Sequence, residues 1–359
     1  MLKLILQLAL GAVAGAIIAI FLFGDVGDGN MAGQLGSVLI TVVSVTVIFV
    51  LGIIIHELGH LVFGLLTGFR FSSFKLGSFV WYKEDGRIRF SVSANIAAGQ
   101  CLMVPPDDPK DFRFVLYNLG GGFFNLLFCL PLLTLILMLP PGSFWSGQFV
   151  TGITVNIFLA LANLIPIKPI TNDGANVWEA LKSKDATRGM YMMLYMNSQL
   201  TEGKRFRDFD QALFKVSEGA DLSNYMVAYT VMLEAARLED MGLHDEFAKL
   251  CASLDLKKLP SLYSALIKAD LLYYHIVYSP DFDKAREIYK DKKLLKFLKS
   301  NLPTLMRISA AYEFFVLENK EKGRDLLAKA RKGTENLPNK GQRIMEAEYI
   351  EKLEEMMEE

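Results

Sequence analysis

The chain combines a half with long apolar runs and a half with shorter amphipathic patterns. Four apolar runs are long enough to cross, or nearly cross, a ~30 Å hydrocarbon core as helices. They are Leu4 to Phe23, Ser37 to Leu66, Phe114 to Leu139 and Phe149 to Ile165. The first run exceeds the ~7 to 15 residues of a signal-peptide core, so we expect an uncleaved anchor. The pattern predicts a mainly α fold, a polytopic membrane bundle of about four transmembrane helices.

A β-hairpin insertion is predicted between the second and third runs. In the stretch Phe79 to Val92, apolar and polar residues alternate on both sides of Glu84-Asp85-Gly86, a good turn sequence. Such a hairpin offers a strand edge to which an extended peptide segment could be added. The other interpretation is an amphipathic hairpin that rests on the membrane surface.

The second half predicts a soluble helical domain. Pieces such as Tyr225 to Leu250, Ala265 to Tyr289 and Ala310 to Ala330 each suggest two helices joined by a turn, with starts about forty residues apart. The intervals of Ala285 to Tyr289, and of Gly323 to Leu327 and Ala330, are similar to those of tetratricopeptide repeats, which favours a small α-solenoid. Such a module would dock substrate or a cytoplasmic protein partner, and the alternative is a helical cap on the membrane core.

Charge separates the same two halves. Residues 1–179 carry nine Lys or Arg and ten Asp or Glu of the 38 and 39 in the chain, which leaves 29 of each for the rest. We therefore expect an N-terminal anchor and outside loop over 1–36, a membrane core over 37–180 with a cytoplasmic hairpin at 69–100, and a cytoplasmic α-helical domain over 181–359. The net charge of -1 gives no sign of a nucleic-acid partner.

Loop charges predict the orientation. The connections 24–36 and 140–148 contain no Lys or Arg, whereas the connection 69–113 contains seven. By the positive-inside rule the basic connection faces the cytoplasm, in a multi-pass protein of the cell membrane. The three cysteines, Cys101, Cys129 and Cys251, show no metal or redox spacing and are expected to be small buried hydrophobes.

The candidate chemistry lies at the end of the second run. His56-Glu57-Leu58-Gly59-His60 follows 18 uncharged residues, about 27 Å of helix, so it should lie in the inner leaflet. Ionisable residues inside a membrane are costly and usually mark a working site. Residues four apart share a helix face, so His56 and His60 can bind one Zn²⁺ while Glu57 stands beside it. The alternative is a pair of buried histidines held by neighbouring helices.

A catalytic zinc needs a third protein ligand. Asp173 is the candidate, because it follows the fourth run at the depth expected for His56 and His60. The sequence Asn172-Asp173-Gly174 is also a good turn, and turn chemistry needs no metal.

Three motifs together resemble the site-2 protease family of intramembrane zinc metalloproteases. They are His56-Glu57-Leu58-Gly59-His60, Gly121-Gly122-Phe123-Phe124-Asn125, and Asn163-x-x-Pro166 followed by Asp173-Gly174. The resemblance implies that His56, His60 and Asp173 bind zinc, that Glu57 is the general base and acid, and that Asn125 holds substrate or the developing oxyanion. The alternative for Asn125 is an interhelical hydrogen bond that ties the bundle together. Two more residues than usual precede Asp173, and Asn172 stands where the family has leucine.

The function that follows is an intramembrane zinc endopeptidase. It would cleave a membrane-inserted protein or peptide, in regulated intramembrane proteolysis or in the maturation of a peptide precursor. The alternative is a non-catalytic zinc-binding regulator or scaffold that acts through its helical repeats. A metal transporter would show further ligand pairs along the spans, and the sequence contains none.

Overall fold

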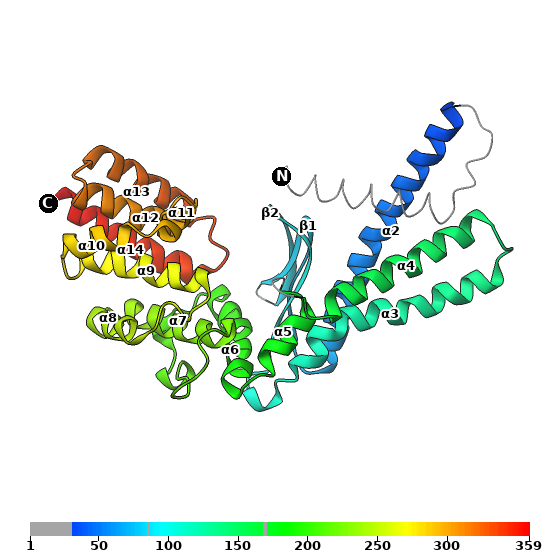
Figure 1. The fold of residues 1–359 in the computed structure, drawn as a ribbon, viewed down its shortest axis with the longest axis horizontal. Helices are drawn as coiled ribbons and strands as arrows, with labels where there is room; N and C mark the ends of the chain where they lie inside the picture. The colour runs from blue at the N-terminus through cyan, green and yellow to red at the C-terminus, as the bar shows by residue number, and fades with distance from the viewer. Residues whose placement is uncertain (1–30, 85, 168–170) are drawn as a thin grey trace. The chain divides into compact units, whose positions relative to one another are not determined.

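The computed structural model describes residues 31–84, 86–167 and 171–359, and the predicted first span, Leu4 to Phe23, lies outside them. The chain is mainly helical and divides into two compact units, Met1–Trp178 and Glu179–Glu359. Figure 1 shows the elements of both units.

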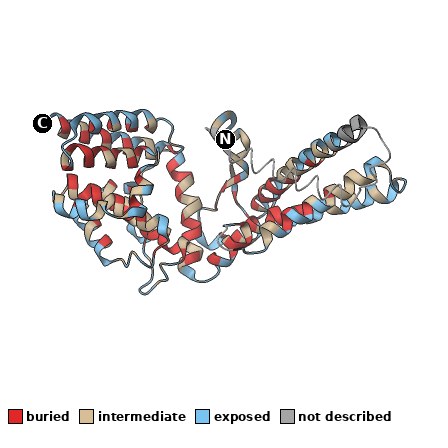
Figure 2. Ribbon diagram, turned by 45° about the horizontal axis from the view of Figure 1, so that its top comes forward, coloured by how far each residue is buried: buried red, intermediate tan, exposed pale blue. Residues whose placement is uncertain are grey.

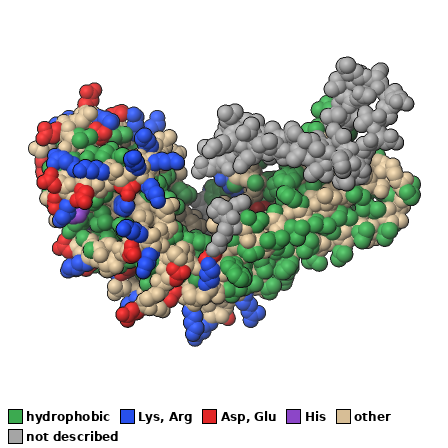
Figure 3. Space-filling view, in the orientation of Figure 1, with side chains coloured by type: hydrophobic (Ala, Val, Ile, Leu, Met, Phe, Trp, Pro, Cys, Tyr) green, Lys and Arg blue, Asp and Glu red, His purple; other side chains and the backbone are tan. Residues whose placement is uncertain are grey.

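Three long helices dominate the first unit. They are α2 (Met31–Leu66), α3 (Phe114–Met138) and α4 (Phe144–Leu164), and each is long and apolar enough to cross a membrane. Large apolar side chains such as Leu51 and Leu137 are at least half exposed. Figure 3 shows apolar side chains covering much of the visible surface of α3 and α4. An apolar exterior is what a helix needs when its solvent is lipid.

The ends of these helices have local causes. Gly68 follows α2 with φ +87, and the Phe69 N–H donates to the Gly64 carbonyl at 3.0 Å, a helix end that favours glycine. The fourth predicted run begins as a helix at Phe144 and not at Phe149, because the Ser143 hydroxyl accepts from the Ser146 N–H at 3.2 Å and caps the first turn.

The predicted hairpin is present and is longer than its alternating pattern suggested. Strands β1 (Arg70–Glu84) and β2 (Arg87–Val104) pair antiparallel, with Glu84 opposite Arg87 and Arg70 opposite Val104. The register shifts near Phe71 and near Gly77, so the alternation is broken outside Phe79 to Val92. A short helix, α5 (Asp173–Ala180), follows α4 and carries the candidate aspartate.

The second unit consists mainly of helices, and most of them pack against the next helix along the chain. They are α6 (Lys184–Thr201), α7 (Tyr225–Asp240), α8 (His244–Ser253), α9 (Ser261–Val277), α10 (Phe282–Tyr289), α11 (Lys292–Leu298), α12 (Pro303–Ala311), α13 (Lys320–Thr334) and α14 (Lys340–Glu358). Figure 2 shows buried residues gathered where these helices face one another. Each of the three predicted helix-turn-helix pieces contains two helices, and the likeness to tetratricopeptide repeats stays a prediction.

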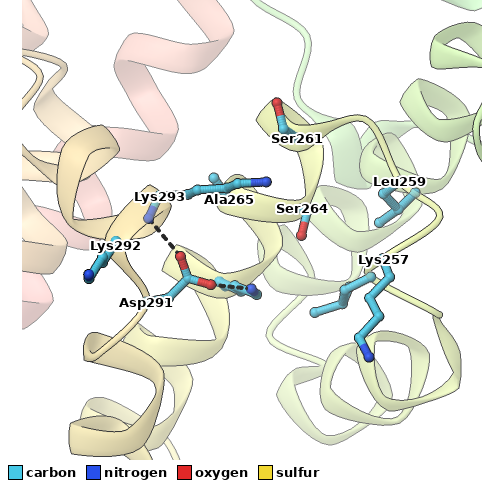
Figure 4. A pocket seen from close by; sticks show the side chains of 10 residues that line it. Lys257, Leu259, Ser261, Ser264, Ala265, Asp291, Lys292 and Lys293 are labelled. Carbon is cyan, nitrogen blue, oxygen red and sulfur yellow. Dashed lines mark hydrogen bonds and ion pairs between the residues drawn. The ribbon is translucent and has the colours of Figure 1, made fainter.

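A pocket of about 450 Å³ opens between the loop before α9 and the start of α11. Figure 4 shows its lining, which includes Lys257, Lys292, Lys293 and two serines. Another lining residue, Lys268, pairs with Asp291 at 2.5 Å. The three remaining lysines are exposed, which is the ordinary surrounding of a lysine on a soluble domain.

Candidate metal centre

Three potential ligand atoms converge where α2 meets α5. His56 Nε2 lies 3.1 Å from Asp173 Oδ2 and 3.1 Å from His60 Nε2, and His60 Nε2 lies 3.3 Å from the same aspartate oxygen. We looked for groups of three or more His, Cys, Asp or Glu side chains whose ligand atoms all lie within 4.8 Å of one another. In the part of the chain that the structure describes, His56, His60 and Asp173 are the one such group. The sequence-predicted ligands are therefore brought together.

The donor set fits zinc. Two imidazoles and one carboxylate are ligands that catalytic zinc sites use, with bonds near 2.0 to 2.2 Å. In a tetrahedron with such bonds, neighbouring ligand atoms lie roughly 3.3 Å apart. The measured separations of 3.1 to 3.3 Å match that edge, so one ion could contact all three atoms and keep a fourth position open.

A hydrogen bond at Nδ1 fixes the orientation of each imidazole. His60 Nδ1 lies 2.9 Å from the Tyr117 carbonyl oxygen, which can only accept, so Nδ1 carries the proton. His56 Nδ1 lies 2.8 Å from Asn125 Oδ1. With both Nδ1 atoms as donors, each Nε2 presents a lone pair toward the centre, as metal binding requires.

Asn125 is held in one amide orientation by its other contacts. Its Nδ2 donates to the Gly52 carbonyl at 3.0 Å and to Asn156 Oδ1 at 2.7 Å. Asn156 in turn donates from Nδ2 to the Gly152 carbonyl at 2.8 Å. The Asn125 side chain is completely buried, and its oxygen is directed at His56.

The glycine-rich part of α3 explains how the helices come this close. A Cβ on Gly121 would lie 2.6 Å from His56 Nε2 and 2.7 Å from His60 Nε2. A Cβ on Gly59 would lie 2.4 Å from the Gly120 carbonyl oxygen. Side chains at these positions would separate α2 from α3 and enter the space of the imidazoles.

Asn172 accounts for the position of Asp173. The Asn172 side chain caps α5 by accepting from the Ala175 N–H at 2.8 Å. Its Nδ2 also donates to the carbonyls of Ala162 and Ile165 at the end of α4, at 2.7 and 2.6 Å. The longer connection before Asp173 is thus anchored to α4, and it sets Asp173 at the first position of α5.

The electrostatics favour an ionised Asp173. Burial disfavours the carboxylate, but the two imidazoles beside it outweigh this effect and lower the pKa of Asp173 to about 2. Glu57 is 7% exposed, and it accepts a hydrogen bond from the Cys101 backbone on β2. An anionic ligand and a buried carboxylate beside it are the parts of a metal-dependent hydrolytic site.

Several residues of this site carry no motif of their own. Tyr117, Asn156 and Cys101 contribute through hydrogen bonds to residues far away in the sequence. An asparagine such as Asn156 in an apolar span is the one signal that could have been followed, because buried amides need partners.

Fold and site together define a class: helices long and apolar enough to span a membrane, packed around a candidate metal site of two histidines and an aspartate. Residues 44–150 match Peptidase family M50, the site-2 protease family, which confirms the resemblance drawn from the motifs. The match covers less than a third of the chain, and it implies an intramembrane metalloprotease in general. Such enzymes are generally zinc-dependent. The match ends before Asp173. No curated protein and no solved structure matches the chain.

Proposed function

We propose that this protein is an intramembrane zinc endopeptidase that hydrolyses a peptide bond of a membrane-inserted substrate. One observation carries the proposal: three unprotonated ligand atoms converge at 3.1 to 3.3 Å, with Glu57 beside them, inside a set of apolar helices. The match to Peptidase family M50 over residues 44–150 supports the same function.

His56, His60 and Asp173 would hold the ion. Zinc there would supply Lewis-acid polarisation of a water molecule and of the substrate carbonyl. Glu57 accepts the proton that the attacking water loses and delivers it to the leaving amine. The Cys101 N–H steadies the Glu57 carboxylate for both transfers.

We assign Asn125 a positioning role beside the substrate-binding role that its motif suggests. Its oxygen contacts His56 Nδ1, and its nitrogen is used by Gly52 and Asn156. This geometry favours a role in orienting the His56 ring over a role in binding substrate or an oxyanion.

The proposed orientation places the metal centre toward the cytoplasm. The hairpin connection between α2 and α3 carries seven of the nine basic residues of the first unit, and the positive-inside rule assigns that connection to the cytoplasmic side. We assign the second unit to the same side. Thiol labelling with a membrane-impermeant reagent at single cysteines in the 84–87 turn and in the 140–143 turn tests this, because opposite sides predict opposite labelling in sealed cells.

The decisive experiment compares wild type with Glu57→Gln. Membrane fractions of cells that make either protein are examined by proteomics, and purified proteins in detergent are given fluorescein-labelled casein. We expect peptide fragments only with wild type, and equal zinc content in both. Equal fragment yields from the two proteins would contradict proteolysis. Equal zinc content with no fragments from wild type would favour the non-catalytic zinc regulator. A site that only binds zinc does not need Glu57 as a base.

A further inference from the structure

Strand β2 passes directly over the candidate catalytic base. At Gly99 the strand is so close to α2 that a Cβ would lie 2.6 Å from Glu57 Oε1 and 2.8 Å from Glu57 Cγ. It would also lie 2.7 Å from Ile53 Cγ2. Real Cβ atoms essentially never approach other atoms within 3.0 Å, so position 99 accepts only glycine while Glu57 keeps this conformation.

Two residues further along, the same strand is tied to both neighbouring helices. The Cys101 N–H donates to the Glu57 carboxylate, and the Cys101 carbonyl accepts from the Tyr117 hydroxyl at 3.0 Å. Tyr117 lies on α3, and its own carbonyl holds His60. The strand, the base and one metal-binding imidazole therefore share one hydrogen-bonded unit.

The contacts of Cys101 also determine whether the edge of β2 opposite β1 can pair with another strand. In an antiparallel pair, the N–H and C=O of a residue point to the same side of the strand. Both groups of Cys101 point at α2 and α3, away from β1. That part of the β2 edge is closed to an added substrate strand.

We propose that Gly99 is a positioning residue for Glu57, and this inference rests on the proposed protease function. The missing side chain lets β2 approach close enough for the Cys101 N–H to hold the carboxylate. A methyl group at position 99 meets Glu57 Oε1, Glu57 Cγ and Ile53 Cγ2, so either the Glu57 side chain or strand β2 must shift. Either shift separates the carboxylate from the Cys101 N–H. A misplacement of about 1 Å at a reacting group can cost about 10²-fold in rate.

The first test is Gly99→Ala in the full chain in detergent. With fluorescein-labelled casein as probe, we expect kcat to fall about 10²-fold while zinc content stays at the wild-type value. The matched control is Gly147→Ala on α4, where a Cβ meets nothing within 4 Å. Wild-type kcat for Gly99→Ala would overturn the proposal.

A double-mutant cycle separates positioning from general damage. The substitution Glu57→Asp withdraws the carboxylate oxygen that would lie 2.6 Å from a Cβ at position 99, while the contact with Ile53 Cγ2 at 2.7 Å remains in both backgrounds. Under single-turnover conditions with excess enzyme, Gly99→Ala should cost at least about tenfold less in the Glu57→Asp protein than in wild type. An equal loss in both backgrounds would overturn the positioning role. The protease function itself fails if Glu57→Gln equals wild type or if wild type yields no fragments, so the two failures are distinct.

Discussion

Both units contain histidines and buried charged side chains, and among the described residues only the first unit brings such groups together as a candidate metal site. His56 and His60 have a partner on both ring nitrogens, and their Nε2 atoms point at each other and at Asp173. In the second unit, His244 and His275 each have a buried Nδ1 with no hydrogen-bond partner, and His244 stacks on Tyr278. Converging lone pairs, and not burial of ionisable groups, distinguish a metal centre.

The buried charges of the second unit follow a different logic. Arg307 donates from Nε to Glu346 at 2.7 Å, and its guanidinium lies over the rings of Tyr273 and Tyr349. Glu346 also accepts from the Thr304 hydroxyl at 2.7 Å. This cluster ties α12 to α14, so its expected effect is on stability. Four predictions test this difference between the two units.

The largest expected effect is the loss of the metal. His60→Ala removes one of three ligands, so bound zinc should fall from about one per chain to below about 0.1, and hydrolysis should disappear. His244→Ala is the matched control, because it removes a buried histidine without a ligand role. Zinc analysis of both purified proteins checks the prediction. A normal zinc content in His60→Ala would remove the basis of the proposed centre.

The next effect concerns the second unit alone. Arg307→Ala leaves Glu346 buried without its cation, which should cost about 3 to 5 kcal/mol of unfolding free energy. Hydrogen exchange in α12 and α14 of the full chain measures this loss, and zinc content should not change. Replacing both residues, as Arg307→Met with Glu346→Leu, should cost less than the single change. A loss of zinc in Arg307→Ala would show that the two regions are not independent.

Sequence reasoning worked best where spacing along one helix determines geometry. The four-residue interval between His56 and His60 places both rings on one face of α2, whatever the rest of the fold. Asp173 required only an estimate of depth in the membrane. The long apolar runs likewise predicted α2, α3 and α4, because a bilayer demands helices of that length.

Prediction from sequence was weaker for residues whose contacts are distant in the sequence. Asn125 was linked to substrate by its motif, yet its oxygen meets His56, 69 positions earlier in the sequence. Nothing near Gly99 indicates Glu57 as a neighbour, because the approach depends on how β2 docks on α2. Asn172 could be recognised as a turn residue, but its bonds to the end of α4 depend on the path of the connection.

A smaller effect tests how the imidazoles are held. Asn125→Ala removes the acceptor for His56 Nδ1, so zinc affinity or kcat should fall about 10 to 100-fold. Asn163→Ala is the control, since the Asn163 side chain bonds the Leu159 carbonyl of its own helix. Competition with a zinc chelator gives the affinities. If Asn125→Ala changed KM alone, with zinc affinity and kcat as in wild type, the substrate-binding role suggested by its motif would be favoured.

The smallest effect is a pH dependence confined to the second unit. Burial raises the pKa of Asp270 to about 7, although Arg307 opposes the shift. The folded protein then keeps a proton that the unfolded chain releases near pH 4, so stability falls as pH rises from about 4 to about 7 and levels off above that. Asp270→Asn holds no such proton and should lose this part of the slope.

Unfolding of the second unit at pH 5.5 and pH 8.0, followed by hydrogen exchange in α9, measures the slope. Wild type should be less stable at pH 8.0, and the difference should shrink in Asp270→Asn. Glu239 also has a raised pKa through burial, so part of the slope remains. Burial lowers the pKa of His244 and His275, which adds stability as pH rises in both proteins and cancels in the comparison. An identical slope in the two proteins would mean that Asp270 is ionised in the folded protein. The second unit would then bury a carboxylate without the neighbouring imidazoles that Asp173 has in the first unit.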